Sequence, residues 1–150
     1  MTDFLVWREE WLLHIDPFDA DHKEMVRLLN LLASSETCTA NPGEKEGSAD
    51  KDTPATESLL SRFDALISHI RDHFAREEAF IESINYPGCQ EHKREHTVQM
   101  AAFTVLRRHL SSSEAATLER EDLQGIKMWF LDHVFGEDRH YADFYQKNPH

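Results

Sequence analysis

The feature that most constrains this chain is a helical spacing of apolar residues that continues through four long segments. Gaps of three and four residues dominate, and this spacing lines up one face of an amphipathic helix. No alternating run of five or more residues competes with it, so nothing in the pattern predicts a strand. The segments predicted as helices are residues 18–34, 54–85, 88–110 and 114–135.

The breaks between these segments predict how the helices connect. Residues 34–56 contain two Gly, two Pro and almost no large apolar side chain, which predicts a flexible loop. Asn85 to Gly88 is a compact turn signal, and Ser111 to Ser113 is typical of a helix end followed by an N-cap. Short links make neighbouring helices antiparallel, so the predicted fold is all-α, an up-down-up-down four-helix bundle.

The two ends of the chain add smaller elements to this bundle. Residues 1–17 are predicted to form an N-terminal arm that ends at Asp16-Pro17 and packs through Trp7 and Trp11. Residues 137–147 are predicted to add a short terminal helix. A length of 150 residues suits a single domain, residues 1–150, which needs no disulfide to build a core.

The composition excludes several classes of partner. The net charge of −12 argues against nucleic acid and anionic membranes, which require clustered Lys and Arg. No stretch reaches about 18 apolar residues, so no membrane insertion is expected. The first residues lack the apolar run of a secretory signal, which predicts a cytoplasmic location. Cys38 and Cys89 could pair, but two reduced thiols are favoured in such a location.

Histidine is unusually frequent, with ten residues against five glycines. Residues four apart on a helix share a face, so His73 lies beside Glu77, and His92 lies beside His96. These pairs, like His22 and His133, fall in line with the apolar stripe of their helices. Their side chains are therefore predicted to point into the bundle, where an unpaired ionisable group is costly.

His133 and Asp138 do not fit this rule, because they are five residues apart. On a regular helix their side chains would point about 140° apart, at about 100° per residue. A bend or a wide turn between them would aim both inward. Gly136 lies in the interval and can permit such a bend, so we expect a distortion there.

The donor set predicts two metal ions. Seven donors are too many for one tetrahedral zinc ion, and the oxygens are too few for calcium or magnesium. Two imidazole-rich ions bridged by the carboxylates fit best, and this donor set suits iron without excluding manganese or zinc. A metal-free core held by unrelated hydrogen bonds remains the simpler alternative. The seven predicted ligands are His22, His73, Glu77, His92, His96, His133 and Asp138.

The pattern resembles the hemerythrins, specifically the single-domain bacterial hemerythrins. The residues that carry the resemblance are His22 in DADH, His73 and Glu77 in HFAREE, His92 and His96 in HKREH, and His133 and Asp138 in WFLDHVFGED. The Tyr86-Pro87 turn and the N-terminal Trp also look like the family, and the resemblance covers nearly the whole chain.

The resemblance implies a cofactor and a role for each ligand. His92, His96 and His133 would bind one iron, and His22 and His73 would bind the second. Glu77 and Asp138 would bridge the two irons together with an oxo or hydroxo group. Dioxygen would bind reversibly at the second iron, so the implied function is oxygen storage or delivery rather than enzymatic turnover.

Two positions depart from the pattern expected of the family. Asp21 precedes the first ligand where Gln is common, and Phe130 stands where the fourth helix usually has a Leu that lines the oxygen pocket. Phe130 is bulkier than Leu, so we expect it to narrow the site. Neither change removes a predicted ligand.

Two other functions are compatible with the same donors. A sensor or regulator would respond to oxygen, nitric oxide or redox state, with the acidic loop 34–56 as its candidate effector region and an unknown protein partner. A di-iron oxidase or peroxidase is less favoured, because such bundle enzymes use more carboxylates and Glu-x-x-His motifs. His14, His69, His109, His140 and His150 fit no inward set and are predicted to lie at the surface or behind the ligands.

Overall fold

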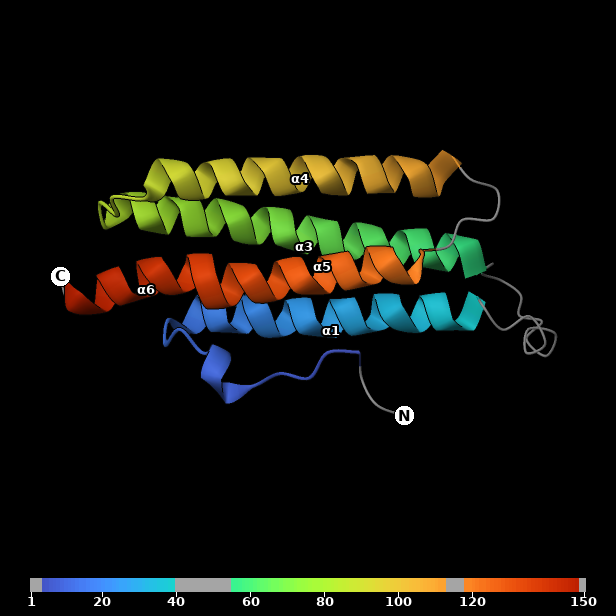
Figure 1. The fold of residues 1–150 in the computed structure, drawn as a ribbon, viewed down its shortest axis with the longest axis horizontal. Helices are drawn as coiled ribbons and strands as arrows, with labels where there is room; N and C mark the ends of the chain where they lie inside the picture. Colours follow the sequence, from blue (N-terminus) through green and yellow to red (C-terminus); the bar gives the residue numbers. More distant parts are fainter. Residues whose placement is uncertain (1–3, 40–54, 113–117, 149–150) are drawn as a thin grey trace.

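The computed structural model describes residues 4–39, 55–112 and 118–148, and within them every regular element is helical. Four long helical rods lie side by side and alternate in direction (Figure 1). The elements are a 3-10 turn at Glu9–Trp11, then α1 (Asp16–Thr39), α3 (Ala55–Ser83), α4 (Cys89–Ser112), α5 (Arg120–Asp132), a π-helical turn at His133–Glu137 and α6 (Asp138–Lys147). The predicted all-α four-helix bundle is confirmed.

The apolar faces of the helices form the core between the rods. Helix α1 packs on α3, and α3 packs on α4. Phe63 and Phe103 meet edge to face in this core, with ring centroids 6.5 Å apart, a favoured arrangement for aromatic pairs. The core thus uses the stripe of residues three and four apart that the sequence shows.

The fourth rod is built from two helices joined by a wide turn. The backbone N–H of Asp138 donates to the carbonyl of His133, a hydrogen bond between residues five apart that defines a π turn. This is the distortion predicted between His133 and Asp138. Gly136 lies within it, but an added Cβ would meet nothing within 4 Å, so the turn does not depend on the missing side chain.

The described part of the N-terminal arm packs on the bundle. Trp11 is buried and lies edge to face against Trp7 and Phe130, at centroid distances of 5.4 and 6.0 Å. The amide side chain of Asn30 pairs with both backbone groups of Leu5 at 2.8 Å, which fixes the start of the arm to α1.

Three predicted boundaries need correction. Helix α1 begins at Asp16 rather than residue 18, because Pro17 is favourable in a first helical turn. Its end at Thr39 lies beyond the predicted residue 34, because an established helix can propagate through polar residues. Helix α5 begins at Arg120 rather than 114, where Glu119 and Asp122 form a reciprocal capping box.

The predicted loop 34–56 is therefore shorter than expected, since α1 and α3 enter it from both sides. Residues 40–54 and the predicted N-cap Ser113 lie outside the described residues. The turn at Asn85 to Gly88 joins α3 to α4 as predicted.

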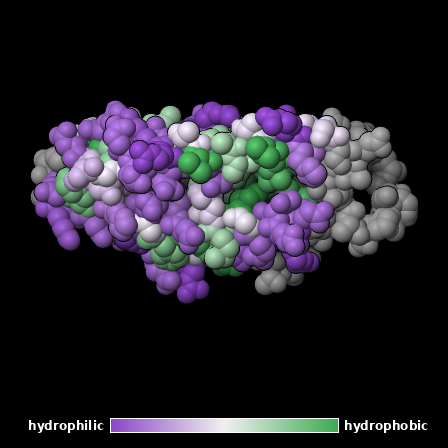
Figure 2. Space-filling model, turned by 45° about the horizontal axis from the view of Figure 1, so that its top comes forward, coloured by the Kyte–Doolittle hydropathy of each residue, from purple (hydrophilic) through white to green (hydrophobic). Residues whose placement is uncertain are grey.

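Figure 2 shows a face that is largely hydrophilic, with hydrophobic side chains gathered near its middle. None of the helices in the described part of the chain combines the length and hydropathy that crossing a bilayer requires.

One buried carboxylate holds the junction between the arm and α1. His14 has a φ of 64°, a left-handed conformation that is unfavourable for a residue with a side chain. Asp19 accepts hydrogen bonds from the backbone N–H groups of Leu13 at 2.7 Å and His14 at 2.9 Å. The Asp19 carboxylate therefore stabilises this bend from within the first turn of α1.

We expect Asp19→Asn to lower the free energy of unfolding by about 1–3 kcal/mol, because an amide cannot accept both hydrogen bonds as a carboxylate does. Denaturant unfolding of equally metal-loaded proteins measures the change. Asp143→Asn on the exposed side of α6 is the matched control and should stay within about 0.5 kcal/mol of the parent. Equal stability of the two variants would contradict the role of Asp19.

Candidate metal centre

All seven predicted ligands converge in the interior of the bundle. Each is buried, with at most 4% of its surface exposed. Helix α1 contributes His22, α3 contributes His73 and Glu77, and α4 contributes His92 and His96. The π turn and the start of α6 contribute His133 and Asp138, respectively. Four rods therefore deliver nitrogen and oxygen donors to one place.

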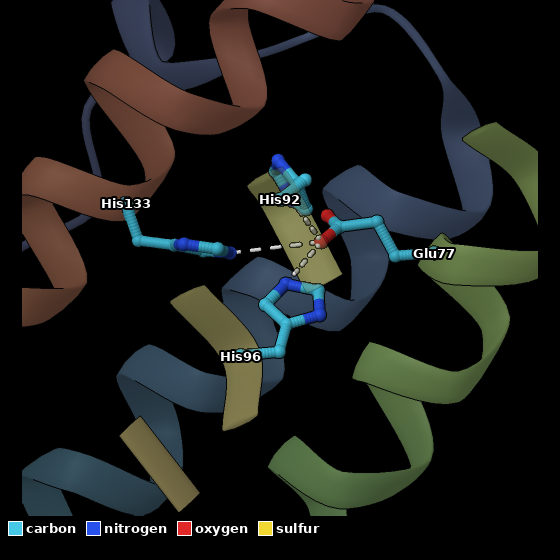
Figure 3. A group of neighbouring side chains, drawn as sticks. All are labelled: Glu77, His92, His96 and His133. Atoms are coloured by element: carbon cyan, nitrogen blue, oxygen red, sulfur yellow. Dashed lines mark hydrogen bonds and ion pairs between the residues drawn. The ribbon is translucent and has the colours of Figure 1, made fainter. Parts of the chain in front are cut away.

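Three histidines gather around one oxygen of Glu77 (Figure 3). The Nε2 atoms of His92 and His96 lie 3.0 Å from Glu77 Oε1, and that of His133 lies 3.6 Å from it. One donor atom from each of these four residues falls within 4.8 Å of the others. This group could hold a metal ion.

Two further histidines lie beside Oε2 of Glu77 and Oδ2 of Asp138. His73 Nε2 lies 3.1 Å from Glu77 Oε2, and His22 Nε2 lies 3.0 Å from Asp138 Oδ2. His22, His73, Glu77 and Asp138 form a second group whose donor atoms fall within 4.8 Å of one another. This group could hold a second metal ion beside the first.

Each carboxylate divides its two oxygens between the two groups. Glu77 turns Oε1 to the three-histidine group and Oε2 to His73. Asp138 turns Oδ1 to His133 at 3.0 Å and to His92 at 3.3 Å, and turns Oδ2 to His22. This division is the arrangement that bridging carboxylates adopt between two metal ions.

Several donor atoms at the centre are buried without a hydrogen bond. They include Nε2 of His96 and His133, both ring nitrogens of His22 and both oxygens of Asp138. The Nε2 atoms lie close enough to carboxylate oxygens to form ion pairs, but not in the geometry of a hydrogen bond. Buried polar atoms are normally satisfied, and leaving them unpaired is costly. Metal ions would satisfy the atoms that face one another here, so the residues fit a di-metal centre.

The charges of the two carboxylates control the histidine pKa values. Burial alone would lower the pKa of His73, but the charge of Glu77 and the hydrogen bond to Asp21 outweigh it and raise the pKa to about 9. For His92, burial likewise lowers the pKa, while the close contact with Asp138 and the hydrogen bond to Glu77 raise it to about 9. Against the same burial, the charge of Asp138 raises the pKa of His133 to about 10.

The carboxylate pKa values move in the opposite direction. Burial tends to raise the pKa of Glu77, but the positive charge of His73 and hydrogen bonds from the histidines hold it well below its usual range. Burial and the charge of Glu77 also oppose ionisation of Asp138, yet its histidine partners hold its pKa below the usual range. Without metal, protons on the imidazoles thus compensate the two carboxylates.

Three supporting residues were not predicted from the sequence. Asp21 and Glu78 each accept a hydrogen bond of 2.7 Å from Nδ1 of a site histidine, Asp21 from His73 and Glu78 from His96. The buried Tyr141 donates its hydroxyl proton to Glu77 Oε2 at 2.7 Å. In the sequence, Asp21 and Glu78 could have been found because each is adjacent to a predicted ligand. Tyr141 could have been found because it lies three residues after Asp138, on the same helix face.

The remaining described histidines lie outside the centre. His14, His109 and His140 are exposed, and the partly buried His69 donates from Nε2 to the backbone carbonyl of Asp21 at 2.9 Å. His150 lies outside the described residues.

Aromatic rings pack around the histidines. Phe74 stacks on His96 with centroids 3.6 Å apart, and Trp129 stacks on His133 at 5.3 Å. Phe130 is buried and lies edge to face against His22 at 6.2 Å. These contacts fix the ring planes and give the centre an apolar wall.

A helical bundle with two such groups in its core is a non-haem di-metal bundle protein. The sequence model of the family described as the hemerythrin HHE cation binding domain matches residues 13–145. Since this match covers most of the chain, the chain belongs to the hemerythrin family.

Similar proteins include two bacteriohemerythrins and one solved hemerythrin. The bacteriohemerythrin of Stenotrophomonas maltophilia is 27% identical, over 93% of this chain and 80% of that protein. The bacteriohemerythrin of Ralstonia nicotianae is 29% identical, over 89% of this chain and 82% of its own length. A crystal structure of a leucine-to-alanine hemerythrin mutant superposes with a TM-score of 0.74 at 18% identity, over 95% of this chain and 97% of that chain.

The histidine pKa values predict how the metal-free protein responds to pH. A group whose pKa is raised on folding stabilises the fold below its unfolded value, near 6.5, and loses that contribution as the pH passes its folded value. Each such histidine lowers the free energy of unfolding by about 1.4 kcal/mol per pH unit within its window. We therefore expect the metal-free protein to lose stability between about pH 7 and pH 10.

Thermal unfolding of the metal-free protein across this range measures the effect. The metal-loaded protein is the control and should lack the decline, because metal ions replace the protons on these nitrogens. A metal-free protein whose melting temperature stays level or rises over the same range would contradict the assigned pKa values.

Proposed function

We propose that the protein binds dioxygen reversibly at a di-iron centre, for oxygen storage or delivery. The observation that carries the proposal is the division of the Glu77 and Asp138 oxygens between a three-histidine and a two-histidine group. Imidazole with carboxylate suits iron, and two buried, bridged positions suit a pair of ions. The family match supports the same reading.

Each of the seven residues has a role in this proposal. His92, His96 and His133 would hold one iron, and His22 and His73 would hold the second. Glu77 and Asp138 would bridge both, together with an oxo or hydroxo group. Two bound iron ions would supply the electrons that reversible dioxygen binding requires.

The protein side chains prepare a place for a small ligand. The position between His22 and His73 has one protein donor fewer than its neighbour, so it is the one left open. Phe130 packs against His22 there and limits the access of water. Tyr141 holds Glu77 Oε2 through its hydroxyl group and fixes the direction of that carboxylate.

The comparisons favour binding over catalysis. The relatives are named as bacteriohemerythrin and hemerythrin, and the resemblance to this family implies reversible oxygen binding rather than enzymatic turnover. We accordingly assign dioxygen as the ligand, with nitric oxide as a second small molecule that the same open position could accept.

The cytoplasmic location remains a prediction from the sequence. Cys89 is a free thiol, and the side chain of Cys38 lies outside the described ones, so the expected pair of reduced thiols stays a prediction.

Metal analysis combined with visible spectroscopy tests the proposal. We expect two irons per chain and, after anaerobic reduction, a charge-transfer absorption that appears with air and disappears when oxygen is removed. Two bound irons without any reversible oxygen-dependent absorption would refute oxygen binding. Clearly fewer than two irons would favour the metal-free bundle, and steady turnover of peroxide with a reductant would favour an enzyme.

Glu77→Gln and His109→Gln provide a matched pair of variants for this test. Glu77 belongs to both groups, so its replacement should reduce the iron content of both positions. His109 is exposed in the last turn of α4, so its replacement should leave two irons bound. Equal iron content in the two variants would contradict the assigned ligands.

We expect Phe130→Leu to open the wall beside His22 and to accelerate the entry of small ligands. Stopped-flow measurement of azide binding to the oxidised protein reports this rate. Phe63→Leu is the control, since Phe63 is equally buried but pairs with Phe103 in the core. Both variants should lose about 1 kcal/mol of stability, and only Phe130→Leu should bind azide faster. Unchanged azide kinetics would show that Phe130 does not limit access.

A further inference from the structure

Three side chains of α3 hold a single residue of α1. His69, His73 and Arg76 follow one another at spacings of four and three, so they share one face of α3. His69 donates to the backbone carbonyl of Asp21 at 2.9 Å, and His73 Nδ1 donates to the Asp21 carboxylate at 2.7 Å. Asp21 is thereby fixed in position relative to His73.

Arg76 completes this arrangement from the surface. Its Nε lies 3.2 Å from Asp21 Oδ2, and its Nη2 lies 3.0 Å from Asp21 Oδ1, a two-pronged pairing of guanidinium with carboxylate. The Arg76 side chain is 47% exposed, that of Asp21 is 14% exposed, and that of His73 is fully buried. A chain of contacts therefore runs from solvent through Arg76 and Asp21 to His73.

The chemistry of these linked contacts follows from the hydrogen bond between His73 Nδ1 and the Asp21 carboxylate. A carboxylate can only accept, so a proton lies on Nδ1 of His73. Nε2 is then the nitrogen that faces the centre, where a metal ion would replace its proton. A carboxylate behind a ligating histidine makes the imidazole a stronger electron donor, and such contacts tune the properties of a metal site. Arg76 withdraws charge from Asp21 and should weaken this donation.

The other group has no arginine paired with its carboxylate among the described residues, although Lys93 lies near enough for its charge to act on Glu78. Glu78 accepts from His96 Nδ1 at the same 2.7 Å, but within the described residues it forms no ion pair with Arg or Lys. The two metal positions thus carry the same carboxylate–histidine contact, and only the position at His73 has an arginine on the carboxylate. The difference makes the two positions electronically unequal.

We propose that the Asp21–Arg76 pair sets the reduction potential of the metal held by His22 and His73, and thereby its resistance to irreversible oxidation by air. This rests on the proposed di-iron function and assigns Asp21 and Arg76 as positioning residues. Asp21 lowers the potential through His73, and Arg76 raises it by neutralising part of the Asp21 charge.

Two single variants should shift the potential in opposite directions. In Asp21→Asn the carboxylate charge is lost, so the potential of the iron-loaded protein should rise and oxidation by air should slow. In Arg76→Gln the carboxylate is released from its partner, so the potential should fall and oxidation should accelerate. Anaerobic spectroelectrochemistry measures the potential. The Asp21→Asn variant should also bind iron about 10- to 100-fold more weakly, because it loses the carboxylate behind His73.

A double variant separates transmission through Asp21 from a direct effect of the Arg76 charge. If Asp21 transmits the effect, Arg76→Gln should change nothing in the Asp21→Asn background. An equal shift in both backgrounds would overturn the proposal in favour of a through-space effect. Arg27→Gln is the matched surface control, because Arg27 is 60% exposed and pairs with Glu24.

A readout independent of iron and oxygen accompanies these measurements. In the zinc-loaded protein, the Nδ1 proton of His73 should give a strongly downfield NMR signal that shifts upfield in Asp21→Asn and further downfield in Arg76→Gln. Variants that keep two irons and bind oxygen reversibly, with unchanged potentials and unchanged signals, would overturn this inference alone. A parent protein that binds no iron pair would instead overturn the proposed function.

Discussion

The structure depends on the burial of two carboxylates and five imidazoles in the interior of one small bundle. Ionisable groups do not remain in an apolar core unless their charges and hydrogen-bonding atoms are compensated. Here the compensation is mutual, since Glu77 and Asp138 each face histidines with both oxygens. Protons on the imidazoles meet this need in the metal-free chain, and metal ions would meet it more completely because they would also satisfy Nε2 atoms that have no hydrogen bond.

The surroundings of the centre show how the chain fixes such a site. Phe74 and Trp129 stack on His96 and His133, which limits rotation of these rings. Tyr141, Asp21 and Glu78 hold the outer atoms of Glu77, His73 and His96 by hydrogen bonds. Ligand positions held from behind in this way do not need to rearrange when a metal ion binds.

The π turn shows how a local irregularity serves the site. A regular helix from α5 into α6 would direct His133 and Asp138 to different sides of the rod. The i to i+5 hydrogen bond between their backbones brings both side chains to the same side, and both are buried there. Such turns occur frequently at functional sites, which agrees with its position between two predicted ligands.

The sequence by itself determined the helical fold and indicated which seven residues gather in the core, because side chains three or four residues apart must share a helix face. The same periodicity required a distortion between His133 and Asp138, although it gave Gly136 a part that the structure does not support. Helix starts were less predictable, because Pro17 in the first turn of α1 and the capping box of Glu119 and Asp122 before α5 are not reported by apolar spacing. Only the tertiary structure decided which oxygen of Glu77 faces which histidines, and which residues hydrogen-bond to the outer nitrogens of these histidines. The reason is that contacts such as that of Arg76 with Asp21 join two helices, and the relative rotation of the helices is set by packing.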